Sequence, residues 1–279
     1  MTTHLHPLIL ATWLAALTAT LLTGCSTTPA KPVNELLRDK QLAQEMAFAE
    51  YKDLNWKAAA RNFKKTADIL NLLDDYPGEA AARHNQARAL QHARQYDDAI
   101  TAYQQALAIN RRLNRADDQA QNLDGLAQCH AAQGRLSQAI ETAEQALPLA
   151  ATSKVLLQND LALFLLQRNQ PGDLDRAQQL LAAALAANPQ SPITQLNLGR
   201  AALRANQPAA ARPHLLAALN AFRQNEDPDG IAHTHEALAR CCAALGEADA
   251  ARFHLEQARQ KFTFLKDTAA LRRLSADQP

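Results

Sequence analysis

Small and large residues recur along the chain in one register, which predicts repeated pairs of helices. Six alanines, spaced 40, 40, 38, 34 and 40 apart, mark this register: Ala59, Ala99, Ala139, Ala177, Ala211 and Ala251. Four residues after each alanine stands a mostly large residue: Phe63, Tyr103, Ala143, Leu181, Leu215 and Leu255. Twelve residues before each, or fifteen in the fourth unit, the chain is again small: Ala47, Ala87, Ala127, Ala162, Gly199 and Ala239. Small residues let two helix backbones approach closely while the larger residue fills the groove between them.

Turn-forming residues separate the predicted helices. Gly134, Gly172 and Gly246 follow the expected first helices of their units, where a left-handed backbone commonly ends a helix. Residues 74–80 (DDYPGEA) and 226–232 (EDPDGIA) contain Pro and Gly, and each is expected to end one helix and begin another. Helical patterning therefore extends over nearly the whole chain after residue 33.

The register resembles the tetratricopeptide repeat, a helix-turn-helix unit of about 34 residues. The large residue that the family places at its 17th position is matched by Trp56, Tyr96, Leu136 and Leu174, and Pro189 matches its 32nd. The resemblance implies an all-α, right-handed superhelical solenoid of about six repeats over residues 34–265, with a C-terminal cap and tail over 266–279. Four of the five intervals exceed the usual repeat length, which is typical of a longer variant of the family.

The fifth unit departs most from the pattern. Pro208 suits the first turn of its second helix, but Pro213 removes a hydrogen bond unless that helix begins late or bends. A bend at this position is therefore predicted. The residues from Leu271 to Leu274 are expected to form a short cap over the last repeat, because stacked repeats need their apolar end covered.

An apolar segment precedes the repeats. Residues 8–23 carry no charge and would extend about 24 Å as a helix, less than the roughly 30 Å of a bilayer core. Residues 22–25 (LTGC) resemble the lipobox of bacterial lipoproteins, which implies a signal peptide over 1–24, a lipidated Cys25 and a tether over 25–33. No Lys or Arg precedes the apolar segment, which departs from the usual signal. An ordinary signal peptide or an uncleaved anchor remains the alternative.

The resemblance to lipoproteins also implies a location. The acyl chains expected on Cys25 would hold the protein on a membrane almost permanently. In that class, a residue other than Asp directly after the lipidated cysteine favours transport to the outer membrane, and this chain has Ser26 there. We therefore expect a lipid-anchored protein on the periplasmic face of the outer membrane.

Composition and charge narrow the function. The 29 Lys and Arg residues nearly balance 28 Asp and Glu residues, so the net charge of +1 gives no field for nucleic acid. No phosphate-binding glycine loop, nucleophile elbow or metalloprotease helix occurs in the sequence. We therefore expect no enzyme, no cofactor and no metal. We expect His233 and His235 to lie on a helix surface. We expect buried, reduced thiols at Cys129, Cys241 and Cys242.

The family binds partners on the concave face, which the first helix of each repeat lines. Carrying its groove positions onto this sequence gives the candidate residues His84, Arg88, Asp124, Gln128, Asn159, Arg200, Arg204, Glu236 and Arg240. Phe48 and Tyr51 hold the same positions in the first repeat, but aromatic residues there are more often core. A groove with more arginine than carboxylate suits an acidic segment or a C-terminal carboxylate.

These observations predict a membrane-anchored scaffold that binds another protein or a peptide. Lipoproteins of this plan include type IV pilus pilotins, the repeat lipoprotein of the barrel-assembly machinery and adaptors that dock peptidoglycan hydrolases. The pilotins resemble this chain most in length and repeat number, although their repeats are nearer the usual family length. Two alternatives remain: a cytoplasmic regulator that senses peptides, and a periplasmic protein with a ligand-binding or enzymatic site.

Overall fold

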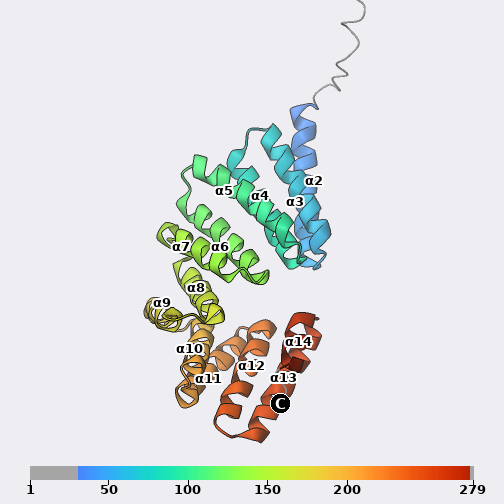
Figure 1. The fold of residues 1–279 in the computed structure, drawn as a ribbon. Helices are drawn as coiled ribbons and strands as arrows, with labels where there is room; N and C mark the ends of the chain where they lie inside the picture. Colours follow the sequence, from blue (N-terminus) through green and yellow to red (C-terminus); the bar gives the residue numbers. More distant parts are fainter. Residues whose placement is uncertain (1–30, 277–279) are drawn as a thin grey trace, which may run out of the picture. The chain divides into compact units, whose positions relative to one another are not determined.

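The chain is helical throughout the part that the structure describes. The computed structural model describes residues 31–276, where thirteen α-helices follow one another (Figure 1). They are α2 (Val33–Lys52), α3 (Trp56–Leu72), α4 (Tyr76–His92), α5 (Tyr96–Arg112), α6 (Ala116–Ala132), α7 (Leu136–Ala146), α8 (Lys154–Arg168), α9 (Asp173–Ala187), α10 (Pro192–Arg204), α11 (Pro208–Gln224), α12 (Pro228–Ala244), α13 (Ala248–Phe264) and α14 (Thr268–Ala276). A short 3₁₀ helix, Leu147–Leu149, follows α7. The all-α prediction is confirmed, whereas Cys25 and the predicted signal lie outside the described residues.

Helices that are neighbours in the sequence are also neighbours in space. Contacts divide the chain into Met1–Asp39 and Lys40–Pro279; the division falls within α2, and the helices from α3 onward lie in the second unit. Within that unit each helix from α3 to α14 packs against the next one (Figure 1). The first helices of successive repeats also touch one another, α4 with α6, α6 with α8, α8 with α10 and α10 with α12. These five helices form one face, and that face carries the candidate groove residues.

The long repeat interval has a simple structural origin. Seven helices, α3 to α6 and α11 to α13, have 17 residues each, and a three-residue turn gives a period of 20. Two such helices and their turns account for the interval between Ala59 and Ala99. The shortest interval, from Ala177 to Ala211, falls where the helices are shorter, since α9 has 15 residues and α10 has 13.

Each turn of this kind uses a left-handed residue one position past the helix cap. Positive φ values recur with the same period, at Leu54, Asp74, Arg94, Asn114 and Gly134, and again at Asn206, Glu226, Gly246 and Lys266. After α4, the Arg94 N–H donates to the Gln91 carbonyl and the Gln95 N–H to the Leu90 carbonyl, both at 2.9 Å. This pairing satisfies the last carbonyls of the helix. Gly134, Gly172 and Gly246 all have a positive φ as predicted, but α8 ends with left-handed Asn169, and Gly172 stands directly before α9. Most of the other turns use a residue with a side chain.

The recurring small residues lie between helices, as the register predicts. Five of the six marker alanines are completely buried, and the buried large residues four positions later include Phe63, Tyr103 and Leu181. Ala251 and Leu255 are only half-buried, because the one helix that follows their pair, α14, has nine residues. The alanines permit close helix contact, and each fully buried Leu or Phe contributes about 1.5–3 kcal/mol.

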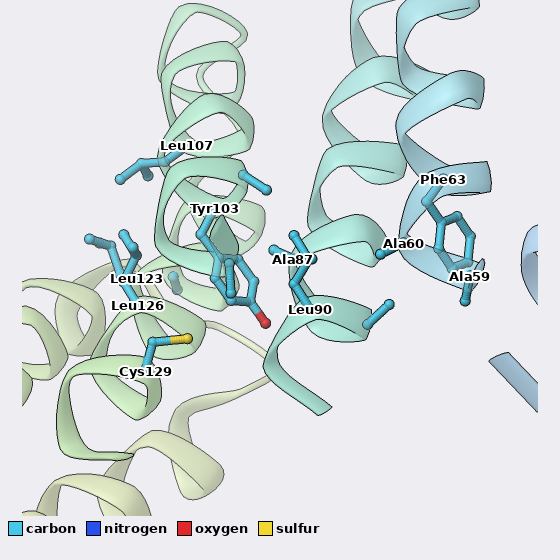
Figure 2. Close-up of a cluster of buried hydrophobic side chains, with 14 of the residues drawn as sticks. Ala59, Ala60, Phe63, Ala87, Leu90, Tyr103, Leu107, Leu123, Leu126 and Cys129 are labelled. Atoms are coloured by element: carbon cyan, nitrogen blue, oxygen red, sulfur yellow. The ribbon is translucent and has the colours of Figure 1, made fainter. Parts of the chain in front are cut away.

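Tyr103 shows how tight this packing is. Figure 2 shows its ring between α4 and α6, beside Leu90, Leu123, Leu126 and Cys129. The Tyr103 hydroxyl donates to Gln91 Oε1 at 2.9 Å. A Cβ atom added at Gly125 would lie 2.2 Å from Cζ of this ring, so only glycine fits there without movement.

The two Pro- and Gly-containing connectors end and restart helices as predicted. Before α4, Asp75 Oδ1 accepts the Gly78 N–H at 2.9 Å, and Pro77 stands in the first turn. Before α12, Asp227 Oδ1 accepts the N–H groups of Asp229 and Gly230 at 3.1 and 3.0 Å. Such side-chain caps satisfy backbone donors that have no partner within the helix.

Helix α11 starts at Pro208 and continues through Pro213, so the helix does not begin late. A bend at Pro213 therefore stays a prediction. At the C-terminal end, Ala270 and Leu274 of α14 are buried against Ala258 and Phe262 of α13, and they cover the apolar end of the array.

Two expectations about single side chains are wrong. His235 is buried and not on the helix surface, because α11 and α13 enclose α12 from two sides, and its Nδ1 lies 2.9 Å from Nδ1 of His254. Phe48 is 50% exposed although its ring contacts that of Phe63, with ring centres 5.2 Å apart. The three cysteines are unpaired and buried, as predicted.

Candidate partner-binding face

The candidate groove residues lie on the five first helices that contact one another: His84 and Arg88 on α4, Asp124 and Gln128 on α6, Asn159 on α8, Arg200 and Arg204 on α10, and Glu236 and Arg240 on α12. Three of them, Arg88, Arg204 and Arg240, are exposed. His84, Gln128 and Arg200 are half-buried, and Asp124, Asn159 and Glu236 are buried. The face thus consists of exposed arginines above a floor of polar side chains.

Hydrogen bonds join the floor across α4, α6 and α8. Gln91 Nε2 donates to Gln128 Oε1 at 2.8 Å. Gln128 Nε2 in turn donates to Asp160 Oδ2 at 2.9 Å and to Asp124 Oδ2 at 3.0 Å. Because Tyr103 donates to Gln91, this chain of amides starts in the hydrophobic core and ends at two carboxyl groups. The side chains are therefore held in fixed positions before any partner binds.

The two carboxyl groups lie close together; Asp124 is buried and Asp160 is half-buried. Burial and the charge of Asp160 together raise the pKa of Asp124 to about 8, although the hydrogen bond from Gln128 acts in the opposite direction. Burial likewise raises the pKa of Asp160. The pair therefore holds a proton at neutral pH, since two carboxylates at this distance repel one another.

The α4 end of the face combines a neutral histidine with a cation. His84 Nδ1 lies 3.0 Å from Asn122 Oδ1, and burial lowers the pKa of His84. The Arg88 guanidinium lies over the Tyr51 ring, 5.7 Å from the ring centre. Tyr51 packs edge-on against Trp56, so aromatic rings position this positive charge.

A second polar chain crosses α8 and α10. Asn159 Nδ2 donates to Thr194 Oγ1 at 2.9 Å, and Asn197 Nδ2 donates to Asn159 Oδ1 at 3.3 Å. Arg200 Nη1 donates to Asn197 Oδ1 at 3.3 Å. Burial lowers the pKa of Arg200 to about 10, with an opposing contribution from Glu236. This guanidinium is positioned by a neutral amide.

The α12 end is built around one carboxylate. Glu236 accepts two hydrogen bonds from Arg273 of α14, both at 2.9 Å, and one from Arg240 at 3.0 Å. Burial raises the pKa of Glu236, but the hydrogen bond from His233 and the charges of Arg273 and Arg240 outweigh it and hold that pKa well below the usual range. Glu236 is thus ionised and fully engaged.

Six contributors to this face were missed from the sequence: Gln91, Asn122, Asp160, Thr194, Asn197 and Arg273. Asp160 and Asn197 share one position, two residues before the small residues Ala162 and Gly199, so the register itself contained a signal for them. Arg273 lies in α14, which was expected only to cover the last repeat.

Residues 31–276 contain neither a membrane-spanning helix nor a metal-binding cluster. No helix there is long and apolar enough to span a bilayer. No group of three or more His, Cys, Asp or Glu side chains in that range is placed to hold a metal ion.

A face of paired helices with polar inner residues defines a helical repeat scaffold. The chain belongs to the tetratricopeptide repeat family, whose sequence profile matches residues 40–112, 80–152 and 190–262. No curated protein matches the sequence. Repeat proteins of this class present surfaces to other proteins and are not catalytic as a rule.

Solved structures support the same fold. PilW, described as a widely conserved type IV pilus biogenesis factor, is 19% identical with a TM-score of 0.60, over 84% of this chain and 96% of its own. PilF of Pseudomonas aeruginosa is 17% identical with a TM-score of 0.56, over 88% of this chain and all of its own. The apo form of RapI is 8% identical with a TM-score of 0.68, over 92% of each chain. At these identities the likeness concerns the fold alone.

Proposed function

We propose that the protein is a lipid-anchored adaptor on the periplasmic face of the outer membrane. The face of α4, α6, α8, α10 and α12 binds an extended segment of a partner protein. The observation that carries the proposal is the layer of oriented amide and guanidinium groups on that face. Extended backbone offers alternating donors and acceptors, and side chains held by their own hydrogen bonds bind it with little further loss of entropy.

The proportions of the face favour a peptide segment over a small ligand. The hollow beside His84, Asn85 and Asn122 has a volume of about 130 Å³. Pockets for drug-sized ligands have roughly 300–1,000 Å³ and a mostly apolar lining. The polar side chains are instead spread along five helices, as an extended partner requires.

The anchor rests on the sequence of residues 22–25, and the type of complex on similarity of fold. PilW is described as a pilus biogenesis factor, and this chain covers 96% of its length. We place the protein in the assembly of an envelope complex, of which pilus or secretin assembly, outer-membrane barrel assembly and docking of peptidoglycan hydrolases are the candidates.

The anchor is tested by Cys25→Ser, with Cys129→Ala as a control that removes a thiol from the repeats. Cys25→Ser should abolish palmitate labelling and retention in the outer-membrane fraction, and Cys129→Ala should leave both unchanged. Inhibition of the lipoprotein signal peptidase should cause the precursor to accumulate. Retention of Cys25→Ser in the outer membrane would contradict the lipid anchor, and no accumulation of precursor would favour the cytoplasmic alternative.

The binding face is tested by placing a photo-crosslinking amino acid at exposed positions in cells. Arg88 and Arg204 lie on first helices, and Arg61 and Arg252 are matched exposed arginines on second helices. A partner bound on the proposed face forms crosslinks from Arg88 and Arg204 but not from Arg61 or Arg252. Crosslinks only from the second helices would place the partner on the opposite face and refute the proposal.

A further inference from the structure

The outer side of α3 carries a stripe of basic side chains. The basic stripe consists of four exposed residues: Lys57, Arg61, Lys64 and Lys65. Their spacing places them on one side of the helix, because residues three and four apart are neighbours there. Leu72 continues the stripe and is 68% exposed. A hollow of about 290 Å³ lies in it, lined by Arg61, Lys64, Lys65, Asp68, Ile69 and Leu72. Since α3 is the second helix of its repeat, the stripe does not belong to the face of first helices.

Most of the charge of the basic stripe is not balanced by a carboxylate. Asp68 Oδ2 lies 2.9 Å from Lys64 Nζ, and its Oδ1 lies 2.8 Å from Arg83 Nη2 of α4. These two ion pairs occupy both oxygens of Asp68. The ion pairs within residues 31–276 do not include the other three members of the stripe. Three positive charges therefore remain on one side of α3.

The repeat register shows that this charge is confined to α3. The four positions of the stripe lie two residues before the marker alanine and two, five and six residues after it. At these positions α5, α7, α9, α11 and α13 have no Lys or Arg, and they have six exposed carboxylates: Asp97, Glu141, Glu144, Asp175, Asp249 and Glu256. An arginine beside the marker alanine in three of these helices is paired in each case: Arg176 with Glu144, Arg212 with Glu247 and Arg252 with Asp249. The later second helices are thus neutral or acidic where α3 is basic.

The basic stripe also lies nearest in the sequence to the proposed anchor. Lys57 follows Cys25 by 32 residues, whereas its counterpart on the next second helix, Asp97, follows it by 72. The tether residues 26–33 span at most about 27 Å when fully extended. A protein held at Cys25 therefore keeps α3 closer to the bilayer along the chain than any later second helix.

We infer that the outer side of α3 docks onto anionic phospholipid headgroups of the membrane that holds the anchor. The inference rests on the proposed function, because the lipid on Cys25 is what keeps this side of α3 at a bilayer. Each Lys or Arg near an anionic lipid surface adds about a fivefold gain in affinity, and Leu72 supplies an apolar contact beside them. The same surface repels the acidic positions of the later second helices. Docking through α3 therefore orients the array and leaves the face of first helices free for the partner.

The test uses the full-length protein as cells process and acylate it, reconstituted into two kinds of vesicle. One kind is phosphatidylcholine alone, and the other is an equal mixture of phosphatidylcholine and phosphatidylglycerol. The acyl chains insert into both, so a difference between them reports the headgroup charge. An uncharged acetylating reagent modifies exposed lysines, and mass spectrometry measures the rate at each one. The lysines of the basic stripe should react about fivefold more slowly on the anionic vesicles. The exposed Lys154 and Lys266 should react equally on both.

A matched pair of double variants tests whether the stripe causes the slowing. Arg61→Gln with Lys65→Gln is compared with Lys154→Gln with Arg252→Gln, which removes the same charge from exposed positions on α8 and α13. The slowing at the remaining lysines of the stripe should be lost in the first variant and kept in the second. About 1 M salt, which screens charges beyond about 3 Å, should abolish the slowing while the anchor keeps the protein on the vesicles. Equal reactivity of wild type on both vesicles, or equal losses in the two variants, overturns the inference.

Failure of the inference and failure of the proposed function give different results. If the purified protein carries acyl chains but its lysines react alike on both vesicles, the docking side fails and the anchor stands. If the protein carries no acyl chains, the anchor fails and the inference fails with it. A photo-crosslinker at Arg61 that captures a protein, without slowing on anionic vesicles, would show that the stripe binds an acidic protein and would overturn the inference. Crosslinks from Arg88 and Arg204 should persist in the Arg61→Gln, Lys65→Gln variant, and their absence from wild type counts against the proposed binding face itself.

Discussion

Replacement of Gly125 by alanine should destabilise the protein, and the sign of the effect should depend on Tyr103. The new Cβ would lie 2.2 Å from Cζ and 2.5 Å from Cε1 of the Tyr103 ring. Ordinary contact between carbon atoms requires about 3.5–4.0 Å, so the ring has to move by about 1 Å or more. The ring is buried and its hydroxyl is bonded to Gln91, so such a movement disturbs the core and the first hydrogen bond of the polar chain.

The magnitude follows from three contributions. Overpacking of a core costs about 1–3 kcal/mol, and loss of the Tyr103–Gln91 hydrogen bond about 1 kcal/mol more. Alanine is a better helix former than glycine by about 1 kcal/mol, which offsets part of this. The free energy of unfolding should therefore fall by about 1–3 kcal/mol, and Tm by about 2–4 °C for each kcal/mol.

The assay is a double-mutant cycle with Tyr103→Leu, measured by urea unfolding and circular dichroism. Leucine has no atoms where Cζ and Cε1 stood, so the obstruction is absent in that background. Gly125→Ala should then become neutral or stabilising by up to about 1 kcal/mol. Equal destabilisation in both backgrounds would show that the close approach of α5 and α6 is not the reason for glycine at this position.

Three further outcomes follow from single side chains. Because burial beside Asp160 raises the pKa of Asp124 to about 8, the native state keeps a proton that the unfolded chain releases near pH 4. Asp124→Asn should therefore gain stability relative to wild type as pH rises from 4 to 8 in urea titrations, and a constant difference would contradict this. Burial and the nearby His254 lower the pKa of His235 to about 4, so wild type should lose up to about 3 kcal/mol relative to His235→Gln as pH falls from 6.5 to 4. If calorimetry showed that the Tm values of wild type and His235→Gln change in parallel with pH, this prediction would be wrong. Asp227→Ala should cost about 1 kcal/mol by removing a helix cap, whereas Asn55→Ala, at a cap position without a side-chain bond, should cost less; equal losses would argue against capping.

The fold could be predicted because the helices of every repeat have to bury their apolar side in the same way. A helix with one apolar stripe cannot bury that stripe alone, so the spacing of small and large residues identifies its neighbours. The aligned alanines, the glycine turns and the long repeat interval could all be predicted in this way. His235 and Phe48 could not, because their exposure depends on how completely the neighbouring helices enclose them.

Less of the candidate site than of the fold could be predicted from the sequence. Its positions were transferred from the family, and position alone does not separate an exposed arginine such as Arg204 from a buried aspartate such as Asp124. Contributions from α4 and α14, such as Gln91 and Arg273, follow from side-chain reach across helices that are distant in sequence. Electrostatic properties of the face depend on those contacts.

Spacing along the chain was enough to establish that it forms paired helices, where they turn, and which residues lie between them. These features depend on the register within one repeat and its neighbour. Which charges are satisfied could be known only from the folded arrangement, which places two arginines on Glu236, leaves Arg200 with an amide, and brings Asp124 and Asp160 together. The reason is that the burial of a residue follows largely from its position in the repeat. A charge pair instead depends on distances of a few ångströms between side chains from different helices.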